Sequence, residues 1–499
     1  MAQKKRKEER KILFNTLFPE EARGVISTGQ DVELVEMENQ LERGIVGNIY
    51  LGEVENVEPA LQAAFVDFGG KRNGFLPFSE FFSPALVSRK KSKKRKNNHP
   101  EGKVYLKKGD RIIVQVVKDE SPLKGAVLTS YVSIAGRYLV LMMGMRKAGI
   151  SKRITDEGTR EKIKKQVAKL SLPANMGVIV RTVGADRKLK ELREDLRKLK
   201  EHLGIVQKKA KEMEKPGILY AEQDLVTRFL RDHYDSAVSR IVVDTDASYE
   251  RALGFLNIYA PEKKGDLFRY KGKVPIFDHY RVEEGVEKIF SNRVELASGG
   301  YLIIDVTEAF ITIDVNSGRS VKDRDIEETA YRTNLEAARE IPRQLRLRDL
   351  GGIIVMDFID MENRQHKREV ERAVRTAMRG EKARHDIGPI GKFSVMTMTR
   401  QRLGTSPYAV RFEECPSCFR SGKRKSSGSV SSEFFREILR RSVPDEENVL
   451  KFTLSPLLFE YIVNTLSERI REIEEYTGNR LDLKVDFSLR GYSFAGAPP

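Results

Sequence analysis

The chain has 499 residues, enough for three or more domains, and its 90 Lys and Arg against 73 Asp and Glu give a formal net charge of +17. Two Cys exclude a disulfide framework, and no apolar run approaches the length of a membrane span. The charge excess favours a polyanionic partner such as RNA, although it also serves plain solubility. The basic residues 1–11 are not followed by the apolar core of a signal peptide, so we expect a cytoplasmic protein.

Residues 47–133 show the pattern of a small β-barrel. Short apolar runs alternate with glycine-containing turn signals, and the candidate strands are residues 49–57, 63–68, 74–77, 111–117 and 126–133. Phe65, Phe68 and Phe75 lie near lysines and arginines, and Lys124 could join them across the barrel. Oligonucleotide-binding barrels interleave aromatic rings with cations so that single-stranded bases can stack. A lone phenylalanine is more often part of a core, so the residues alone leave both interpretations open.

The segment after the barrel combines one strong helix with a short strand. Leucines recur at spacings of three and four from Leu189 to Leu203, which predicts an amphipathic helix used for packing. Residues 177–184 (GVIVRTVG) predict a strand that leads into Arg181 and Thr182. Taken alone, Arg181 is one of many surface arginines.

Within the barrel segment, the basic run at residues 89–98 is too charged to pack. It predicts a loop that either holds phosphate non-specifically or is simply solvated.

Residues 300–358 hold the most informative pattern of the chain. Apolar periodicity predicts first a β-hairpin, then a helix and then another strand, at residues 301–315, 325–350 and 352–358. Pro342 lies inside the helical pattern and should kink or restart the helix. Asp357 lies inside the otherwise apolar last strand, and a carboxylate there needs a partner because burying an unpaired charge is costly.

Two strands of one sheet could bring Asp357 next to Asp314. In an extended run side chains alternate faces, so Asp314 shares its face with Asn316. Two carboxylates and a carboxamide are oxygen ligands that suit Mg²⁺. The alternative is that each aspartate pairs with one of the many nearby arginines. On spacing alone the two interpretations are about equal.

The remainder of the chain predicts a basic helix, a strand, a linker and a small α/β domain, at residues 363–379, 392–399, 421–432 and 433–499. Arg400 and Arg402 follow the strand and are expected to contact RNA phosphates. His366 and His385 are candidates for acid–base chemistry, but a metal-bound water can supply the nucleophile without a histidine. Asp360 is expected either to support the metal site from behind or simply to end the strand.

Cys415 and Cys418 form a Cys-x-x-Cys half-site, in which both thiolates reach one Zn²⁺. A structural zinc is usually four-coordinate, yet the chain has no third cysteine and its six histidines lie at no matching spacing. A second chain could supply the other half by two-fold symmetry. A redox pair and a plain unliganded pair are the alternatives.

Four stretches resemble the ribonuclease E/G family, the first three of them its catalytic core. They occur in the family's order, and the resemblance extends over nearly the whole chain. They are ITIDVNSG at residues 311–318, LRLRDLGGIIVMDFIDM at residues 345–361, TRQR at residues 399–402 and CPSC at residues 415–418. The residues after CPSC depart from the glycine-rich continuation usual in the family, which affects the local geometry of the link but not its two thiols.

The resemblance implies an α/β multidomain fold in which an RNase-H-like domain is split by two insertions. The implied domains are a first RNase-H-like segment (1–43), an OB-fold RNA-binding barrel (44–133), a 5′-end sensor (134–223), a second RNase-H-like segment (224–285), a DNase-I-like catalytic domain (286–408), a zinc link (409–424) and a small dimerisation domain (425–499).

The resemblance also implies roles for particular residues. Asp314 and Asp357 would bind catalytic Mg²⁺ with Asn316 beside them, and Cys415 and Cys418 would share one structural Zn²⁺ between two chains. RNA would contact the barrel at Phe65, Phe68, Phe75 and Lys124. The 5′-monophosphate of RNA would bind at Gly136, Val140, Arg181, Thr182 and Arg384, where a guanidinium grips phosphate and a hydroxyl adds a hydrogen bond.

The expected function is therefore that of a Mg²⁺-dependent, single-strand-specific endoribonuclease that leaves 5′-phosphate and 3′-hydroxyl ends and is stimulated by 5′-monophosphorylated RNA. By resemblance its substrates are rRNA and tRNA precursors and mRNA, with roles in RNA processing and mRNA decay, and it forms a homodimer or a dimer of dimers. A non-catalytic RNA-binding or ribosome-assembly factor is the alternative, and a DNA nuclease is a third.

Overall fold

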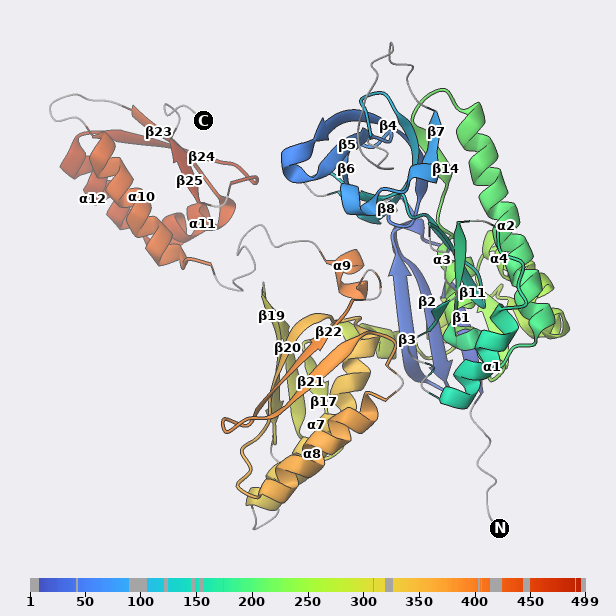
Figure 1. The fold of residues 1–499 in the computed structure, drawn as a ribbon. Helices are drawn as coiled ribbons and strands as arrows, with labels where there is room; N and C mark the ends of the chain where they lie inside the picture. The colour runs from blue at the N-terminus through green and yellow to red at the C-terminus, as the bar shows by residue number, and fades with distance from the viewer. Residues whose placement is uncertain are drawn as a thin grey trace. The chain divides into compact units, whose positions relative to one another are not determined.

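The computed structural model describes residues 9–41, 44–88, 106–120, 124–144, 149–151, 154, 156–173, 175–307, 309–318, 326–379, 381–402, 404, 406–412, 424–442, 449–489 and 491–494. The chain divides into two compact units, residues 1–411 and 412–499, each described by itself (Figure 1). Several separate sheets with helices on them confirm the expected α/β multidomain class. In the described residues, no helix is long and apolar enough to cross a membrane.

A five-stranded sheet is assembled from two segments that lie far apart in the sequence. Its order is β16-β15-β1-β2-β3, with β1 (Arg10–Asn15), β2 (Ala22–Thr28), β3 (Asp31–Glu38), β15 (Arg240–Val243) and β16 (Leu267–Arg269). Because Ile12 and Leu13 point to opposite faces of β1, they enter two different cores. Helices supply the other sides of these cores: α3 (Leu225–His233), α4 (Asp246–Tyr259), α5 (Ile276–His279) and α6 (Glu283–Glu287).

The predicted β-barrel is present between these two segments. Five strands close on themselves in the order β4-β5-β6-β9-β8, since β4 also pairs with β8. They are β4 (Ile49–Glu58), β5 (Ala63–Asp67), β6 (Gly74–Pro77), β8 (Arg111–Lys118) and β9 (Val127–Thr129), with β7 (Leu86–Ser88) and β14 (Gly217–Tyr220) added at the edges. The predicted strand 126–133 is wrong in one respect: it ends at Thr129, and the chain resumes as β10 (Ser133–Ala135) in a different sheet.

That different sheet has the order β10-β11-β13-β12 and continues the core of the barrel. Its other strands are β11 (Leu139–Met143), β12 (Gly149–Ile150) and β13 (Met176–Val180), accompanied by α1 (Glu157–Val167) and α2 (Leu189–Glu212). The predicted leucine stripe is confirmed, because Leu192, Leu196 and Leu199 of α2 are buried in the same core as the barrel residues. The barrel and this sheet are therefore held together by one apolar core.

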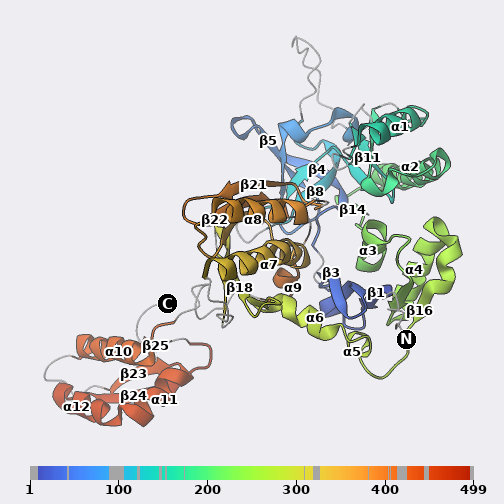
Figure 2. The same cartoon turned by 90° about the horizontal axis from the view of Figure 1, so that it is seen from below.

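A six-stranded sheet carries the predicted aspartates. Its order is β17-β18-β19-β20-β22-β21, with β17 (Arg293–Glu295), β18 (Tyr301–Val306), β19 (Phe310–Asn316), β20 (Gly352–Asp357), β21 (His385–Ile390) and β22 (Val395–Arg400). Two long helices, α7 (Ile326–Leu347) and α8 (Arg364–Ala377), run side by side and pack on one face of the sheet (Figure 2). The short α9 (Pro407–Arg411) follows and packs near β3.

The helix α7 runs without interruption through Pro342, contrary to the expected restart. The proline ring removes one backbone hydrogen bond and crowds the carbonyl of Ala338. Pro342 and Ala338 are both buried, so tertiary packing offsets this local cost.

The second unit is a small α/β domain. Its sheet has the order β24-β23-β25, with β23 (Val449–Leu454), β24 (Arg480–Val485) and β25 (Tyr492–Phe494), and it packs with α10 (Ser427–Arg441), α11 (Pro456–Thr465) and α12 (Ser467–Thr477). The linker prediction for 421–432 is wrong from Ser427 onward. Ser426 caps α10 by accepting from the N–H of Ser429, and Phe434 anchors the helix in the core.

Candidate active site

Asp314 and Asp357 are directly opposite each other on neighbouring strands. β19 and β20 pair in parallel, and their register sets Asp314 beside Asp357. Both aspartates are exposed, whereas Ile313 and Met356 next to them point into the core under α7 and α8. The expectation that one sheet brings the two aspartates together is therefore confirmed, and they lie on the face that the two helices leave open.

The charges around Asp357 are negative. Partial burial raises the pKa of Asp357, and the carboxylates of Asp314 and Asp360 raise that pKa further. Asn316 donates its Nδ2 to Asp314 Oδ2 at 2.8 Å, and Ser394 donates Oγ to Asp360 Oδ1 at 2.7 Å. Among the described residues, the arginines of this sheet and its helices that form ion pairs do so with other carboxylates. The alternative in which arginines neutralise these aspartates therefore has no support in the described residues.

This group of oxygen atoms fits a hard divalent cation. Mg²⁺ prefers oxygen ligands and usually keeps several waters, so one or two protein carboxylates are enough to bind it. A cation between the carboxylates would also relieve the repulsion that raises the pKa of Asp357. Across the stretches of chain that the structure describes, no cluster of three or more His, Cys, Asp or Glu could hold a metal. Asp314 and Asp357, with Asn316 beside them, are the described residues that could hold such an ion.

Two side chains of α7 fix the segment that follows Asp357. The buried Asn334 donates to Ile359 O at 2.8 Å and accepts from Ile359 N at 3.1 Å. Glu327 accepts from two backbone N–H groups just before α8, and His366 Nδ1 lies 2.8 Å from the same carboxylate. Sequence reasoning missed Asn334 and Glu327, because a polar residue in a helical pattern shows no sign of the loop that it contacts.

The barrel places its three phenylalanines differently. Phe65 and Phe75 pair across β5 and β6, half-buried, with ring centroids 5.9 Å apart in an edge-to-face arrangement. Phe68 is only 1% exposed and packs edge-to-face on Tyr50 at 5.1 Å. Lys124 is exposed. Phe65 and Phe75 are thus accessible to a base, whereas Phe68 packs in the barrel core, and we do not retain it as an RNA-contacting residue.

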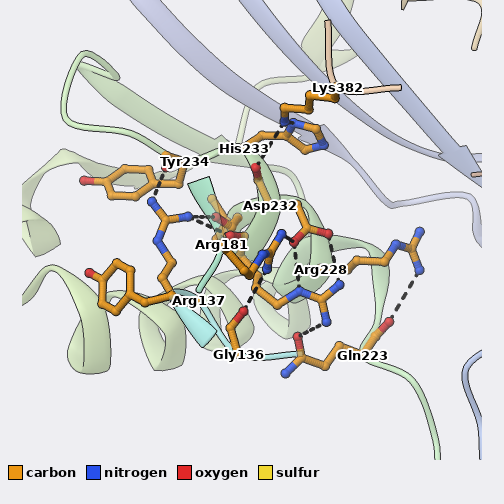
Figure 3. Close-up of polar contacts among 12 residues, drawn as sticks. Gly136, Arg137, Arg181, Gln223, Arg228, Asp232, His233, Tyr234 and Lys382 are labelled. Atoms are coloured by element: carbon orange, nitrogen blue, oxygen red, sulfur yellow. Dashed lines mark hydrogen bonds and ion pairs between the residues drawn. The ribbon is translucent and has the colours of Figure 1, made fainter. Parts of the chain in front are cut away.

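Arg181 is held by two partners that are distant in sequence (Figure 3). Its Nη1 donates to Gly136 O at 2.7 Å, and its Nη2 pairs with Asp232 Oδ1 at 2.5 Å. Burial opposes ionisation of Asp232, but Arg231 and Arg181 hold its pKa well below the ordinary value. The guanidinium of Arg181 is therefore fixed beside a carboxylate whose ionised form is favoured.

The segment directly before β21 of the six-stranded sheet reaches this same place. Lys382 donates Nζ to Asp232 O at 3.3 Å and lies 2.9 Å from His233 Nδ1. Arg384, two residues after Lys382, is exposed. The structure therefore brings the segments that carry Arg181 and Arg384 into contact through Lys382 and Asp232.

The other predicted 5′-end residues of this part of the chain lie on β11 and at the end of β13, close to Arg181 in the fold. Thr182 is exposed at the end of β13, with its Oγ1 3.2 Å from Ser151 Oγ, and Val140 is half-buried on the adjacent β11. Gly136 is required where it lies, because a Cβ there would come within 2.7 Å of the Asp195 carboxylate.

Arg400 is not available to RNA, contrary to expectation. It is 4% exposed and donates to Leu350 O at 2.6 Å, to Asp349 at 3.1 Å and to Glu381 at 3.3 Å. Arg402, by contrast, is exposed.

Two further predictions cannot be compared with the structure. The predicted zinc ligands Cys415 and Cys418 and the basic loop 89–98 lie outside the described residues.

An oligonucleotide-type barrel joined to a sheet with an open pair of carboxylates is typical of the enzymes that process nucleic acids. Comparison with known proteins agrees. The model of the Ribonuclease E/G family matches residues 133–403, and that of the S1 RNA binding domain matches residues 45–129. The chain belongs to the ribonuclease E/G family.

Individual relatives show how much of the family's length this chain covers. It is 36% identical to Ribonuclease G of Escherichia coli K12 over 475 residues, which is 95% of this chain and 96% of the relative. It is 38% identical to Ribonuclease E of Haemophilus influenzae over 472 residues and 37% identical to that of E. coli K12 over 470 residues, in each case 93% of this chain. The chain spans about half the length of these ribonuclease E relatives, 49% and 44%.

Proposed function

We propose that this protein is a Mg²⁺-dependent endoribonuclease that cleaves single-stranded RNA and leaves 5′-phosphate and 3′-hydroxyl ends. The observation that carries the proposal is the pair Asp314 and Asp357, set side by side on an open sheet face with mutually repelling charges. Its family membership and the S1-type barrel support the choice of RNA as substrate.

Each residue of the proposed site has a different role. Asp314 and Asp357 would hold the ion, and Asn316 orients Asp314 through its 2.8 Å hydrogen bond. When bound, Mg²⁺ supplies an activated water and stabilises charge on the scissile phosphate. Asn334 and Glu327 keep the backbone after Asp357 in place, so that the two carboxylates stay in register.

Two further sites would position the RNA. Phe65 and Phe75 of the barrel would stack on bases, with Lys124 contacting phosphate. Arg181, Thr182 and Arg384 would receive a 5′-monophosphate, together with Gly136 and Val140. The orientation of Arg181 by Gly136 and Asp232 supports this pocket, because a fixed guanidinium loses less entropy when it binds phosphate.

The proposal extends to the organisation and the cellular role of the chain. We assign the five-stranded and six-stranded sheets to RNase-H-like and DNase-I-like subdomains. We also propose a homodimer or dimer of dimers in which Cys415 and Cys418 of two chains share one Zn²⁺. Its substrates would be rRNA and tRNA precursors and mRNA, and a cytoplasmic location remains a prediction.

One experiment tests the central claim. An A/U-rich single-stranded RNA oligomer is offered with either a 5′-hydroxyl or a 5′-monophosphate, with and without Mg²⁺, beside a DNA oligomer of the same sequence. We expect cleavage of RNA only with Mg²⁺, and faster cleavage of the monophosphorylated oligomer. RNA that is bound but never shortened would favour a non-catalytic RNA-binding factor, and equal cleavage of DNA would indicate a general nuclease.

A further inference from the structure

The open face of the catalytic sheet continues beyond the aspartate pair. Burial alternates along β19 and β20, so Phe310 and Ile353 lie on the same exposed face as Asp314 and Asp357. In the parallel register Phe310 is directly opposite Ile353, just as Asp314 is opposite Asp357. The two rows are four residues apart along each strand, or about 13 Å at the usual strand rise.

Phe310 and Ile353 form an apolar patch that the described residues leave uncovered. Phe310 is 45% exposed and Ile353 is 46% exposed, on a sheet whose other face is filled by α7 and α8. Both residues line an open hollow of about 410 Å³, together with Gly351, Gly352 and the exposed Arg402. An exposed apolar pair that lines a hollow is a candidate binding surface.

A second hollow adjoins the first, and most of the residues that line it have polar side chains. It measures about 510 Å³ and shares Gly352 and Arg400 with the first, and its remaining lining residues are Arg384, His385, Asp386, Thr399 and Gln401. Arg384 belongs to the proposed 5′-phosphate pocket. The apolar patch is therefore bordered by cations and lies on the same sheet as the carboxylate pair, with Arg384 directly before β21.

An aromatic ring, an aliphatic neighbour and flanking guanidinium groups match the chemistry of single-stranded RNA. Every base offers a π-face for stacking, and each phosphate can pair with an arginine. We propose that Phe310 and Ile353 form a base-binding subsite, in which the Phe310 ring stacks on one base of the RNA a short distance from the cleaved bond. This proposal rests on the proposed endoribonuclease activity and adds a determinant of where cleavage occurs.

The test combines protein variants with substrates that each lack one base. Single abasic nucleotides are placed in turn along a 5′-hydroxyl RNA oligomer, and KM and kcat are measured for the wild type, Phe310→Ala and Phe310→Tyr. Phe268→Ala is the matched control, because Phe268 is 42% exposed on β16 and lies outside the catalytic sheet. Melting temperatures are recorded for all four proteins.

We expect one abasic position to raise the wild-type KM by roughly ten- to a hundred-fold, the range of one base–aromatic stack. Phe310→Ala should raise KM on the intact oligomer by the same factor and lose its sensitivity to that position, with kcat little changed. Phe310→Tyr and Phe268→Ala should behave as the wild type. This pattern would support the subsite.

Three results would contradict the proposal that Phe310 and Ile353 form a base-binding subsite. One is a folded Phe310→Ala that matches the wild type on every oligomer, and another is an undiminished abasic effect in that variant. The third is a change in solution mass with unaltered cleavage, which would make the patch a contact between copies. If the wild type cleaves no RNA, the proposed activity fails instead. The subsite is then judged by anisotropy, where equal RNA affinity of the wild type and Phe310→Ala would reject it.

Discussion

Asp357 has a raised pKa because partial burial and two neighbouring carboxylates disfavour its charged form. A carboxyl group whose pKa is higher in the folded than in the unfolded protein favours folding at low pH, and that contribution is lost as the pH rises through the folded value. At neutral pH the ionised Asp357 therefore costs stability unless a cation compensates for it. Such a cost is what the proposed Mg²⁺ site would entail in the metal-free protein.

We predict that Asp357→Asn abolishes cleavage while it preserves or raises the stability of the metal-free protein. Cleavage should fall by more than about a hundred-fold, since even partners behind the metal ligands cost roughly ten- to a hundred-fold in metal affinity or activity. RNA binding should persist, because phosphate contacts elsewhere supply most of the affinity. Thermal melting with and without Mg²⁺ checks the prediction: we expect Mg²⁺ to raise the melting temperature of the wild type but not that of Asp357→Asn. Substantial turnover by Asp357→Asn in Mg²⁺ would refute the assignment.

Arg181→Ala should weaken the preference for a 5′-monophosphate over a 5′-hydroxyl by about ten- to a hundred-fold, the value of a charge-assisted contact. Slow cleavage of 5′-hydroxyl RNA should remain. Arg197→Ala removes an exposed guanidinium of α2 and serves as the matched control. Competition between the two RNA forms in one reaction measures the ratio directly. The pocket is assigned wrongly if Arg181→Ala keeps the wild-type ratio.

Asp232 has the opposite pKa shift from Asp357. Its pKa lies well below the ordinary value, so its ion pairs stabilise the fold at neutral pH, and this contribution is lost only as the pH falls below about 4. Asp232→Asn should lower the free energy of unfolding by about 1–3 kcal/mol at pH 7, since Arg231 and Arg181 lose a charged acceptor. Urea unfolding at pH 7 and at acid pH should show this difference shrinking. A constant difference would show that the ion pair is not its source.

At the scale of elements, turn residues and alternation predicted most of the fold. Four barrel strands were predicted within one or two residues, because turn residues mark their ends. The alternation of side chains along a strand also predicts which faces Phe68 and Arg400 occupy, and our expectations for these two residues did not take it into account. Phe68 is three residues from Phe65 and so belongs to the opposite face of the strand. Arg400 likewise lies on the same strand face as the buried Met396 and Met398, which points it inward.

Other features could not be predicted from local sequence, since long-range packing creates them. The contact of Asn334 with Ile359 depends on where α7 crosses the sheet, and nothing near Asn334 in the sequence indicates it. The same holds for Arg181 and Asp232, which are 51 residues apart. A helix that passes through Pro342 is another case in which burial overrides local preference.

The barrel allows core and contact phenylalanines to be separated by experiment. Phe65→Ala or Phe75→Ala should weaken RNA binding by about 1–3 kcal/mol each if each ring stacks on a base. Phe68→Ala should instead lower the free energy of unfolding by about 3–5 kcal/mol, since it empties a buried site. Melting temperature and RNA affinity measured on the same samples distinguish the two effects. Unchanged RNA affinity in a stable Phe65→Ala and Phe75→Ala pair would rule out stacking.

For the whole molecule, the two cysteines predict an assembly that one chain cannot complete. In the proposed zinc site, Cys415 and Cys418 would supply half of a four-coordinate set, so a second chain should supply the rest. We expect one Zn²⁺ per two chains by metal analysis. Cys415→Ala or Cys418→Ala should release the metal and shift the solution mass toward monomer. One zinc per chain, or a native dimer without zinc, contradicts this prediction.

The five-stranded sheet has a consequence for how the protein emerges from the ribosome. β1 lies between β2 and β15, and Lys11 pairs with Arg240, 229 residues further along the chain. At a synthesis rate of ~5–20 residues per second, β1 waits on the order of 10–50 s for its parallel neighbour. During that interval the β1–β2–β3 hairpins present an unpaired edge and uncovered apolar faces. Translation speed and chaperone supply should therefore affect the yield of this protein more than its modest subdomain sizes would suggest.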